Sequence, residues 1–230
     1  TSICRPTAGA ALGRHMDVDK LAFTGSTEVG RYFLTYAAES NGKSVSLELG
    51  GKTPQIVLSD CADLDAAASS IAWGVFYNSG QTCHAGTRLV VEKAVEDELL
   101  EKITNIGKSI QPGDPYDPTT AMGTIVDKTQ FERVLGYIDI GKNEGAKVFS
   151  GGEKAEPVKG GVFIKPTVFQ NVKPGMRIER EEIFGPVLTV VRVTSYEQGL
   201  QLINDNQFGN GTAIFTRDGG VARQFQFDVN

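Results

Sequence analysis

Short runs of β-branched and apolar residues alternate with longer helical patterns along the whole chain. This alternation is typical of βα units, in which successive strands lie parallel and helices connect them. The expected strands are residues 21–24, 44–49, 55–58, 87–91, 146–149, 162–164, 187–193 and 212–215. The expected helices are residues 28–40, 63 or 65 to 79, 95–106, 128–143, 196–204 and 221–227. The sequence therefore predicts an α/β fold with a mainly parallel sheet flanked by helices.

The first expected βα unit carries the most local detail. Residues 21–24 read as a buried strand, and Gly25 and Ser26 form a turn in which Ser26 is the helix N-cap. The helix that follows is expected to place one apolar face inward, formed by Val29, Phe33, Tyr36 and Ala37. The turn at 24–27 could also hold a phosphate, because backbone amides and the helix dipole favour an anion there. Most turns of this kind merely join a strand to a helix.

The composition excludes several classes of function. The chain has 230 residues, of which 40% are hydrophobic and 22% charged, and its net charge is −5. A broad surface for nucleic acid or anionic membrane is therefore not expected. With no run of 18 apolar residues and no basic stretch leading into an apolar start, neither a membrane span nor a secretory signal is expected. Because the chain does not begin with methionine, we expect it to be a piece of a longer polypeptide.

The three cysteines, Cys4, Cys61 and Cys83, are widely spaced and contain no Cys-x-x-Cys pair. They match neither a disulfide framework nor a zinc site, so we expect a cytoplasmic protein without a metal. Cys83 lies in a polar loop between Gly80 and Gly86 and is the candidate nucleophile; the alternative is that it is a small buried hydrophobe. Because adjacent side chains rarely face each other, we expect a surface or loop role for His84 and not a contact with Cys83.

Glu48 is the candidate general base. It stands among apolar neighbours at the end of an expected strand, 35 residues before Cys83 and just ahead of Gly50 and Gly51. If the Glu48 side chain faces a cleft, its removal from water would make the carboxylate a better general base. If it does not, Glu48 is one of the solvent-facing residues of an alternating strand. Both interpretations stay open at this point. The acidic and aromatic segment at 181–186 is interpreted as a solvent-exposed turn.

Four segments together resemble one family. The stretches FTGSTEVG (23–30), LELGGK (47–52), GQTC (80–83) and EIFGPV (182–187) occur in the order and spacing of the aldehyde dehydrogenase superfamily. The chain closely resembles that family throughout its length. The resemblance implies oxidation of a small-molecule aldehyde to a carboxylic acid with reduction of NAD or NADP. It also implies an aldehyde dehydrogenase-like catalytic domain together with the last part of a Rossmann-like cofactor domain.

The resemblance also implies roles for single residues. Cys83 matches the nucleophile, which forms a thiohemiacetal and then a thioester, and Glu48 matches the base that activates water for hydrolysis. The backbone amide of Cys83 matches one donor to the oxyanion, and the second donor lies upstream of residue 1. The cofactor contacts match Gly25, Ser26, Val29 and Gly30 on the pyrophosphate side, Glu182 at the ribose, and Leu49 and Phe184 near the nicotinamide.

The resemblance covers only the later part of a full-length family member. It implies that residues 1–49 are the C-terminal part of the NAD(P)-binding domain and that residues 50–230 are the catalytic domain, truncated at its C-terminal end. It further implies a homo-oligomeric parent. Residues 208–216 look more like the methylmalonate-semialdehyde dehydrogenase branch, which leaves the substrate and a composite origin open. The alternatives are an inactive folding or assembly module and a cysteine-dependent esterase that uses no nicotinamide.

Overall fold

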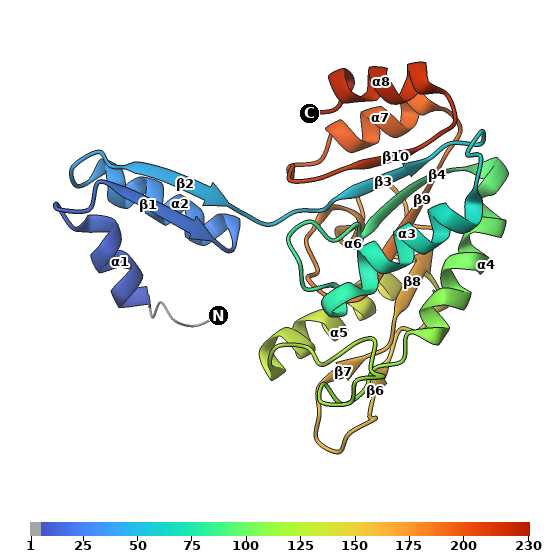
Figure 1. The fold of residues 1–230 in the computed structure, drawn as a ribbon, viewed down its shortest axis with the longest axis horizontal. Coiled ribbons are helices and arrows are strands. Elements are labelled where there is room, and N and C mark those ends of the chain that lie inside the picture. Colours follow the sequence, from blue (N-terminus) through green and yellow to red (C-terminus); the bar gives the residue numbers. More distant parts are fainter. Residues whose placement is uncertain (1–5) are drawn as a thin grey trace. The chain divides into compact units, whose positions relative to one another are not determined.

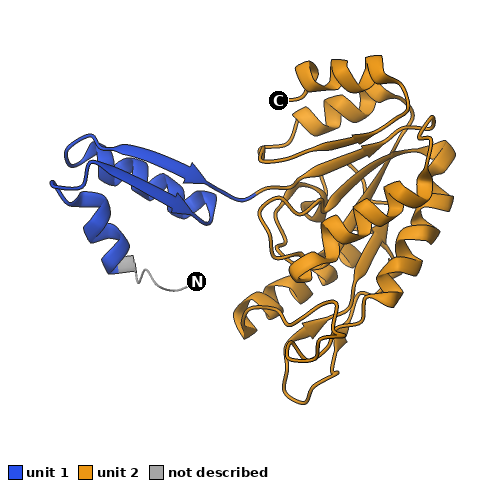
Figure 2. Ribbon diagram, viewed as in Figure 1, with its two compact units in different colours: residues 1–50 blue, residues 51–230 orange. Residues whose placement is uncertain are grey.

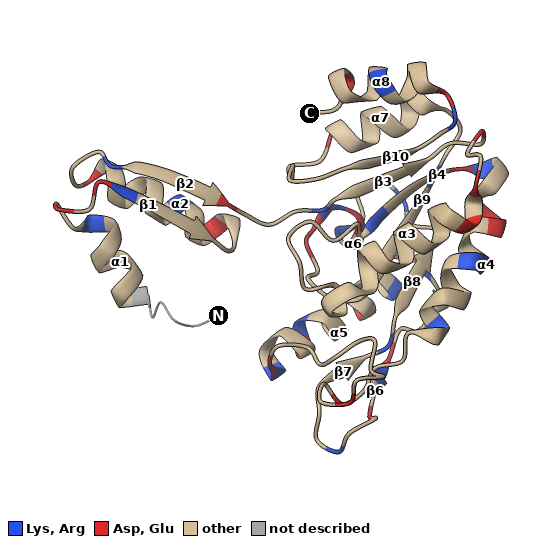
Figure 3. Ribbon diagram, in the orientation of Figure 1, with Lys and Arg blue, Asp and Glu red and all other residues tan. Residues whose placement is uncertain are grey.

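The computed structural model describes residues 6–230, so Cys4 lies outside the described residues. The chain divides into two compact units, residues 1–50 and residues 51–230 (Figure 2). Each is described by itself below. Figure 3 shows that basic and acidic residues are interspersed over the elements of both units. Within residues 6–230, no helix is long and apolar enough to cross a membrane.

Unit 1 is a small βα arrangement with one additional helix. Its elements are α1 (Pro6–Arg14), β1 (Lys20–Thr24), α2 (Thr27–Ala38) and β2 (Ser44–Glu48). Strands β1 and β2 are parallel, with Thr24 opposite Glu48. The ring of Phe33 in α2 packs against Phe23 of β1 with centroids 4.7 Å apart. The ammonium of Lys43 donates a 2.6 Å hydrogen bond to the carbonyl of Gly13 and so ties the end of α1 to the approach to β2.

Two details of unit 1 differ from expectation. Strand β1 is not buried, because its residues alternate between exposed and half-buried. Val29, expected on the inward face of α2, is 40% exposed, while Phe33 and Ala37 are buried as predicted and Tyr36 is half-buried. A two-stranded sheet offers one helix only a narrow surface, so only the central residues of the helical stripe are covered.

Unit 2 contains a large sheet. Its strands are β3 (Pro54–Val57), β4 (Arg88–Glu92), β5 (Lys147–Ser150), β8 (Thr167–Gln170), β9 (Val187–Val193) and β10 (Ala213–Phe215). Their order is β10-β3-β4-β9-β8-β5 (Figure 1). All neighbours are parallel except β5 and β8, which are antiparallel. The predicted α/β fold with a mainly parallel sheet is confirmed.

Helices cover both faces of this sheet, because alternate residues of its central strands point in opposite directions. The helices are α3 (Leu64–Phe76), the 3-10 helix η1 (Tyr77–Gly80), α4 (Lys93–Ser109), α5 (Lys128–Asn143), α6 (Arg177–Arg180), α7 (Tyr196–Asn204) and α8 (Gly219–Asp228). In β4, Leu89 and Val91 join an apolar cluster with α3 and α4. Val90 between them joins a second cluster with α7 and α8. A third cluster packs α5 and α6 against β8 and β9.

Four short elements were not anticipated: α1, α6, β8 and β6 (Lys154–Ala155), which pairs with β7 (Phe163–Ile164), the strand expected at 162–164. Strand β6 lies inside the stretch 151–161, which was interpreted as turns only. Strand β8 has only four residues and ends at Gln170, just ahead of Asn171, which has φ of +58°. Elements this short carry too few residues to show a period, so their pairing partners define them.

Candidate functional site

The loop that carries Cys83 begins where α3 stops. Asn78 (φ +50°), Ser79 (φ +56°) and Gly80 (φ +68°) follow one another in the left-handed region. This conformation is costly for the two residues that carry a β-carbon, and it persists because surrounding contacts hold it. The hydroxyl of Ser79 donates to the carbonyl of Gly123 at 2.9 Å. The chain thereby leaves the helix direction at once and enters the loop before β4, where Cys83 is half-buried.

Gly80 brings the Cys83 loop against the turn that follows Glu182. A β-carbon on Gly80 would lie 2.1 Å from the carbonyl oxygen of Gly185, a distance that no side chain tolerates. Two segments singled out in the sequence, 80–83 and 182–187, are therefore in backbone contact. Glycine is required at position 80 both by this approach and by its positive φ.

Gly51 joins the same place from a third segment. A β-carbon on Gly51 would lie 2.5 Å from the carbonyl oxygen of Cys83. The Gly51 N–H donates a 3.2 Å hydrogen bond to Oε1 of Glu182. Gly51, Cys83 and Glu182 thus converge within unit 2, although they are far apart in sequence.

Helix α5 holds the turn that presents Glu182 and Phe184. Nε2 of Gln130 donates to the carbonyls of Ile183 (3.0 Å) and Phe184 (2.8 Å). Arg133 donates to the Glu182 carbonyl at 2.8 Å. These contacts stabilise Phe184 at φ of +58°, an unusual conformation for an aromatic residue. Neither Gln130 nor Arg133 was identified from sequence, because a helix surface residue gives no sign of which turn it touches.

The carboxyl of Glu182 is partly removed from water. Burial raises its pKa, while the Gly51 N–H and the positive charges of Arg133 and Lys52 oppose this rise. Such a side chain can accept a hydrogen bond from a ligand hydroxyl, because its oxygens are only partly used by the protein.

Gln81 braces the Cys83 loop. Its Oε1 accepts a hydrogen bond from the N–H of Val126 at 2.9 Å. Its Nε2 donates to the carbonyls of Thr124 (3.3 Å) and Asn78 (3.4 Å). The glutamine of the GQTC segment therefore fixes the loop to the chain ahead of α5, a role that the sequence did not indicate.

His84 lies against Cys83, contrary to expectation. Its Nδ1 is 3.8 Å from Sγ of Cys83. The backbone explains the difference, since the Ala85 N–H donates to the carbonyl of Thr82 at 3.2 Å and closes a turn around the two residues. The argument that neighbours face apart holds for regular helices and strands and fails in a tight turn.

A hollow of about 380 Å³ opens beside this turn. Thr82 and His84, the two neighbours of Cys83, both line it. Trp73 of α3 and Tyr77 of η1 form an aromatic part of its wall and are 44% and 65% exposed. The remaining lining residues are Thr53, Gln55, Gly74, Gly86, Gly211, Thr212 and Ala213. The hollow offers an aromatic surface next to the candidate nucleophile.

Lys52 is buried behind the Gly51 contact. It is 1% exposed, and its Nζ is among the buried polar atoms without a hydrogen-bond partner in the part of the chain that the structure describes. Burial lowers the pKa of Lys52 to about 7, assisted by the positive charge of Arg88 and opposed by Glu179, Glu182 and Glu181. Lys52 is the last residue of the LELGGK segment, and no role was predicted for it. A lysine after a glycine turn carries no sign of burial.

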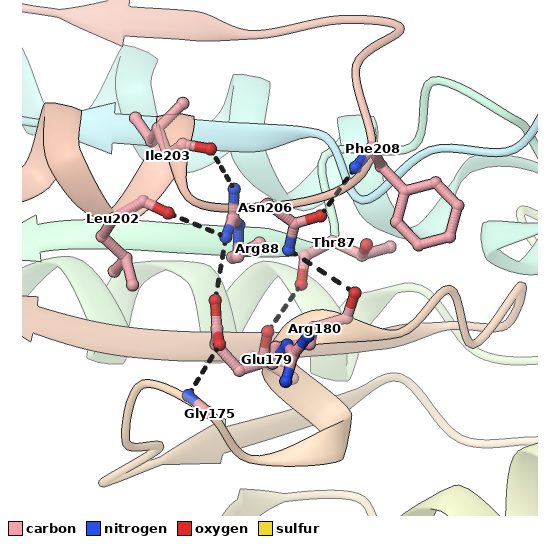
Figure 4. Close-up of polar contacts among 10 residues, drawn as sticks. Thr87, Arg88, Gly175, Glu179, Arg180, Leu202, Ile203, Asn206 and Phe208 are labelled. Atoms are coloured by element: carbon pink, nitrogen blue, oxygen red, sulfur yellow. Dashed lines mark hydrogen bonds and ion pairs between the residues drawn. The ribbon is translucent and has the colours of Figure 1, made fainter.

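A buried ion pair connects strand β4 to helix α6 (Figure 4). Nη1 of Arg88 in β4 lies 2.8 Å from Oε1 of Glu179 in α6, and the two side chains are 1% and 3% exposed. Arg88 also donates to the carbonyls of Leu202 (3.4 Å) and Ile203 (3.5 Å). Oε2 of Glu179 accepts from the Gly175 N–H at 3.1 Å. This network connects β4, α6 and α7.

The other predicted site residues lie in unit 1. Ser26 is the N-cap of α2, as predicted, and accepts a 3.3 Å hydrogen bond from the Val29 N–H. Gly25 in the preceding turn donates to the carbonyl of Glu48 at 3.0 Å. A β-carbon on Gly30 would lie 2.6 Å from Cδ2 of Leu49, so glycine lets α2 pack closely on the end of β2.

These unit 1 residues are compatible with an anionic group. Gly25, Ser26, Glu28 and Val29 are all exposed, so the N-terminal turn of α2 is open to solvent. Backbone amides and the helix dipole favour a phosphate at such a turn. The acidic side chain of Glu28 in the same turn acts against this preference.

Glu48 is the last residue of β2, and its side chain is exposed, in alternation with half-buried Leu47 and Leu49. Cys83 belongs to unit 2, so the approach of Glu48 to Cys83 stays a prediction. Within residues 6–230, no group of three or more His, Cys, Asp or Glu side chains is arranged to hold a metal ion.

Comparison with known proteins identifies what this chain resembles. A family model described as "Aldehyde dehydrogenase family" matches residues 4–230. Human mitochondrial aldehyde dehydrogenase is 47% identical over 213 residues, which are 93% of this chain and 41% of that protein. The NADP/NAD-dependent aldehyde dehydrogenase PuuC of Escherichia coli K12 is 48% identical over 211 residues, 92% of this chain and 42% of that protein. The chain thus spans about two fifths of the length of these relatives.

Solved structures show the same similarity in three dimensions. A crystal structure of indole-3-acetaldehyde dehydrogenase complexed with NAD+ superposes with a TM-score of 0.94 and 41% sequence identity. The match covers 96% of this chain and 45% of that one. The arrangement of elements described above is therefore found in an NAD+-binding protein.

Proposed function

The chain belongs to the aldehyde dehydrogenase family, and from this premise we propose that it is the catalytic part of an NAD(P)-dependent enzyme that oxidises an aldehyde to a carboxylic acid. The observation that carries the proposal is the convergence of Gly51, Cys83 and Glu182 in unit 2. It gathers a nucleophile, a close backbone approach and a carboxylate from three separate segments.

Cys83 performs the first step of the proposed reaction. Its thiolate attacks the aldehyde carbon, a carbon–sulfur bond forms, and the carbonyl oxygen becomes an oxyanion. The backbone N–H of Cys83 is the proposed donor to that oxygen within this chain. Loss of one such donor typically lowers the rate by about 10²- to 10³-fold.

When bound, NAD(P) would provide the hydride acceptor that this oxidation needs. We assign the pyrophosphate side to Gly25, Ser26, Val29 and Gly30, the ribose to Glu182, and the nicotinamide side to Leu49 and Phe184. The exposed N-terminal turn of α2 and the partly free carboxyl of Glu182 support these assignments.

Glu48 is the proposed base for release of the acyl group. It takes a proton from water, the water oxygen attacks the thioester carbon, and the carbon–sulfur bond breaks. The products of this step are the carboxylic acid and the Cys83 thiolate, which is ready for another cycle.

The hollow beside Cys83 is the proposed place for the non-reacting part of the aldehyde. Trp73 and Tyr77 give it an aromatic wall, and threonines and glycines complete it. This lining favours an aldehyde with an apolar or aromatic body.

We assign residues 1–49 to the end of the NAD(P)-binding domain and residues 50–230 to the catalytic domain. The division into units after residue 50 supports this assignment. A cytoplasmic parent that binds neither nucleic acid nor membrane is proposed on the free cysteines and the interspersed charges, and a homo-oligomeric one on membership of the family. The human relative is mitochondrial by name.

A cysteine-dependent esterase is the second candidate, favoured by the contact between Cys83 and His84. The test combines two assays on the purified chain, with Cys83→Ser and Cys61→Ser as a matched pair. Iodoacetamide near neutral pH should label Cys83 first, and only Cys83→Ser should abolish cleavage of a nitrophenyl ester. Faster labelling of Cys4 or Cys61 would contradict the assignment of the nucleophile. Formation of NAD(P)H from an aldehyde by the longer parent polypeptide separates the dehydrogenase from the esterase.

A further inference from the structure

The contact between Cys83 and His84 adds a proton acceptor that the resemblance does not include. Nδ1 of His84 lies 3.8 Å from Sγ of Cys83, and the turn closed by Ala85 and Thr82 holds both side chains on one side. His84 also lines the hollow, so the same side chain contacts the sulfur and borders the space assigned to the substrate. Imidazole is the side chain best suited to exchange a proton near neutral pH.

His84 is the base that the lining of the hollow offers. The lining of the hollow contains no Asp, Glu, Lys or Arg, and its titratable members are His84 and Tyr77. Tyr77 comes from η1 and His84 from the loop ahead of β4; the other lining residues are Trp, Thr, Gln, Gly and Ala, none of which titrates in this pH range. Glu48 of unit 1 is the competing acceptor under the proposed function.

We propose that His84 is a catalytic residue that takes the thiol proton of Cys83 at Nδ1. The S–H bond breaks and an N–H bond forms, so that a neutral pair becomes a thiolate and an imidazolium, and no oxidant or reductant takes part. The inference rests on the proposed role of Cys83 as nucleophile. It deepens that role by naming how the thiolate arises before an aldehyde enters.

The consequence is a thiol that ionises at lower pH. A positive charge within about 4–6 Å favours the thiolate, and cysteines beside a protonated histidine ionise well below the ordinary thiol pKa of about 8.5. A neutral residue at position 84 removes that charge. The thiolate should then form only as the pH approaches the ordinary value.

The test is the pH dependence of Cys83 alkylation by iodoacetamide, followed by peptide mass so that Cys61 serves as an internal reference. In His84→Ala and His84→Asn, the midpoint should rise by about one pH unit or more, which lowers the rate near pH 7 about tenfold. Asn keeps a hydrogen-bonding group but cannot titrate, so equal effects of Ala and Asn identify the proton acceptor. His15→Ala is the matched control, because the chain has two histidines and His15 lies in unit 1; its profile should match that of the parent.

A second measurement does not depend on alkylation. In NMR spectra recorded at one pH, Cys83→Ser should shift the ring signals of His84 and leave those of His15 unchanged. Because His84 is exposed, the substitutions at position 84 should not alter the unfolding temperature. An unchanged alkylation profile in both His84 variants, or a shift in Glu48→Gln alone, would overturn the inference while leaving Cys83 as the nucleophile. Preferential labelling of Cys61 would instead overturn the proposed function.

Discussion

Units 1 and 2 differ in how much apolar surface each buries by itself. Unit 2 covers both faces of its sheet and gathers its apolar residues into three clusters. In the described part of unit 1, the buried apolar side chains are Phe33 and Ala37. Its large exposed apolar side chains are Leu12, Met16, Val29, Tyr32 and Leu34.

The predicted site residues therefore stand on two units that differ in stability. A chain of about 50 residues buries a smaller share of its surface on folding and is marginally stable alone, whereas one of about 150 residues or more buries a larger share. Cys83 and Glu182 therefore stand on a self-supporting scaffold. Gly25, Ser26 and Glu48 stand on one that needs further contacts for stability.

Separating the two units is the largest perturbation, and it tests directly whether they differ in stability. Residues 51–230 produced alone should unfold cooperatively at a temperature close to that of the whole chain, and residues 1–50 alone should show no cooperative transition by circular dichroism. Hydrogen exchange on the intact chain avoids truncation, and it should show faster exchange in α1 and α2 than in α3 and α4. A cooperative transition of residues 1–50 alone would refute the contrast.

Removing one partner of the buried ion pair tests how far unit 2 depends on a polar contact. Glu179→Ala leaves the guanidinium of Arg88 buried without its carboxylate and should lower the free energy of unfolding by about 3–5 kcal/mol. Glu181→Ala is the matched control, because its pair with Arg177 is partly exposed and should contribute less than about 1 kcal/mol. Urea unfolding of the three proteins measures both effects; equal losses would mean that the burial of the Arg88 pair has no energetic weight.

The pH dependence of stability reports on the burial of Lys52 in the core. Burial lowers the pKa of Lys52 from 10.5 to about 7, so between these pH values the unfolded chain binds a proton that the folded chain lacks. Stability then rises with pH across this window, by at most about 1.4 kcal/mol per pH unit, and the penalty is complete below about pH 7.

Lys52→Met should remove this rise and stabilise the chain at neutral pH by roughly 2 kcal/mol or more, because no unpaired ammonium must be buried. The measurement is urea unfolding at a series of pH values, with the exposed Lys159→Met as control. Parallel pH curves for Lys52→Met and the parent would show that Lys52 keeps its ordinary pKa in the folded chain.

The smallest effect concerns the cap of α2. Ser26→Ala removes the acceptor of the Val29 N–H and should cost about 1 kcal/mol locally. Because unit 1 has little stability in reserve, hydrogen exchange should accelerate throughout α2. The same change at Ser195, the N-cap of α7 in unit 2, is the matched control and should accelerate exchange mainly in the first turn of α7. Similar spreading of the effect in both helices would argue against unequal stability.

The sequence predicted the elements with strong periodicity and clear ends. Helices α5 and α7 and strand β9 have the expected bounds, and Asp63 caps α3 as one of the two expected alternatives. These segments are long enough for the apolar period to show. The break of α3 ahead of Cys83 was also predicted, since Ser79 and Gly80 interrupt the helical pattern.

What the sequence could not predict depends on contacts between distant segments. The burial of Lys52 and the clamp from Gln130 arise only when β3, α5 and the turn after Glu182 are brought together. The contact of His84 with Cys83 depends on the dihedral angles of a tight turn, which composition does not report. The exposure of Val29 follows from the small sheet of unit 1 and not from the pattern of α2.

The close approach of Gly80 to the Gly185 carbonyl limits how this protein can change over generations. Every amino acid other than glycine adds a β-carbon, and at position 80 that atom would lie 2.1 Å from a backbone oxygen, at a residue with φ of +68°. No amino acid has a smaller side chain than glycine, so every substitution at position 80 is expected to disturb this contact. A lineage that loses Gly80 must first move a backbone segment about a hundred residues away along the chain.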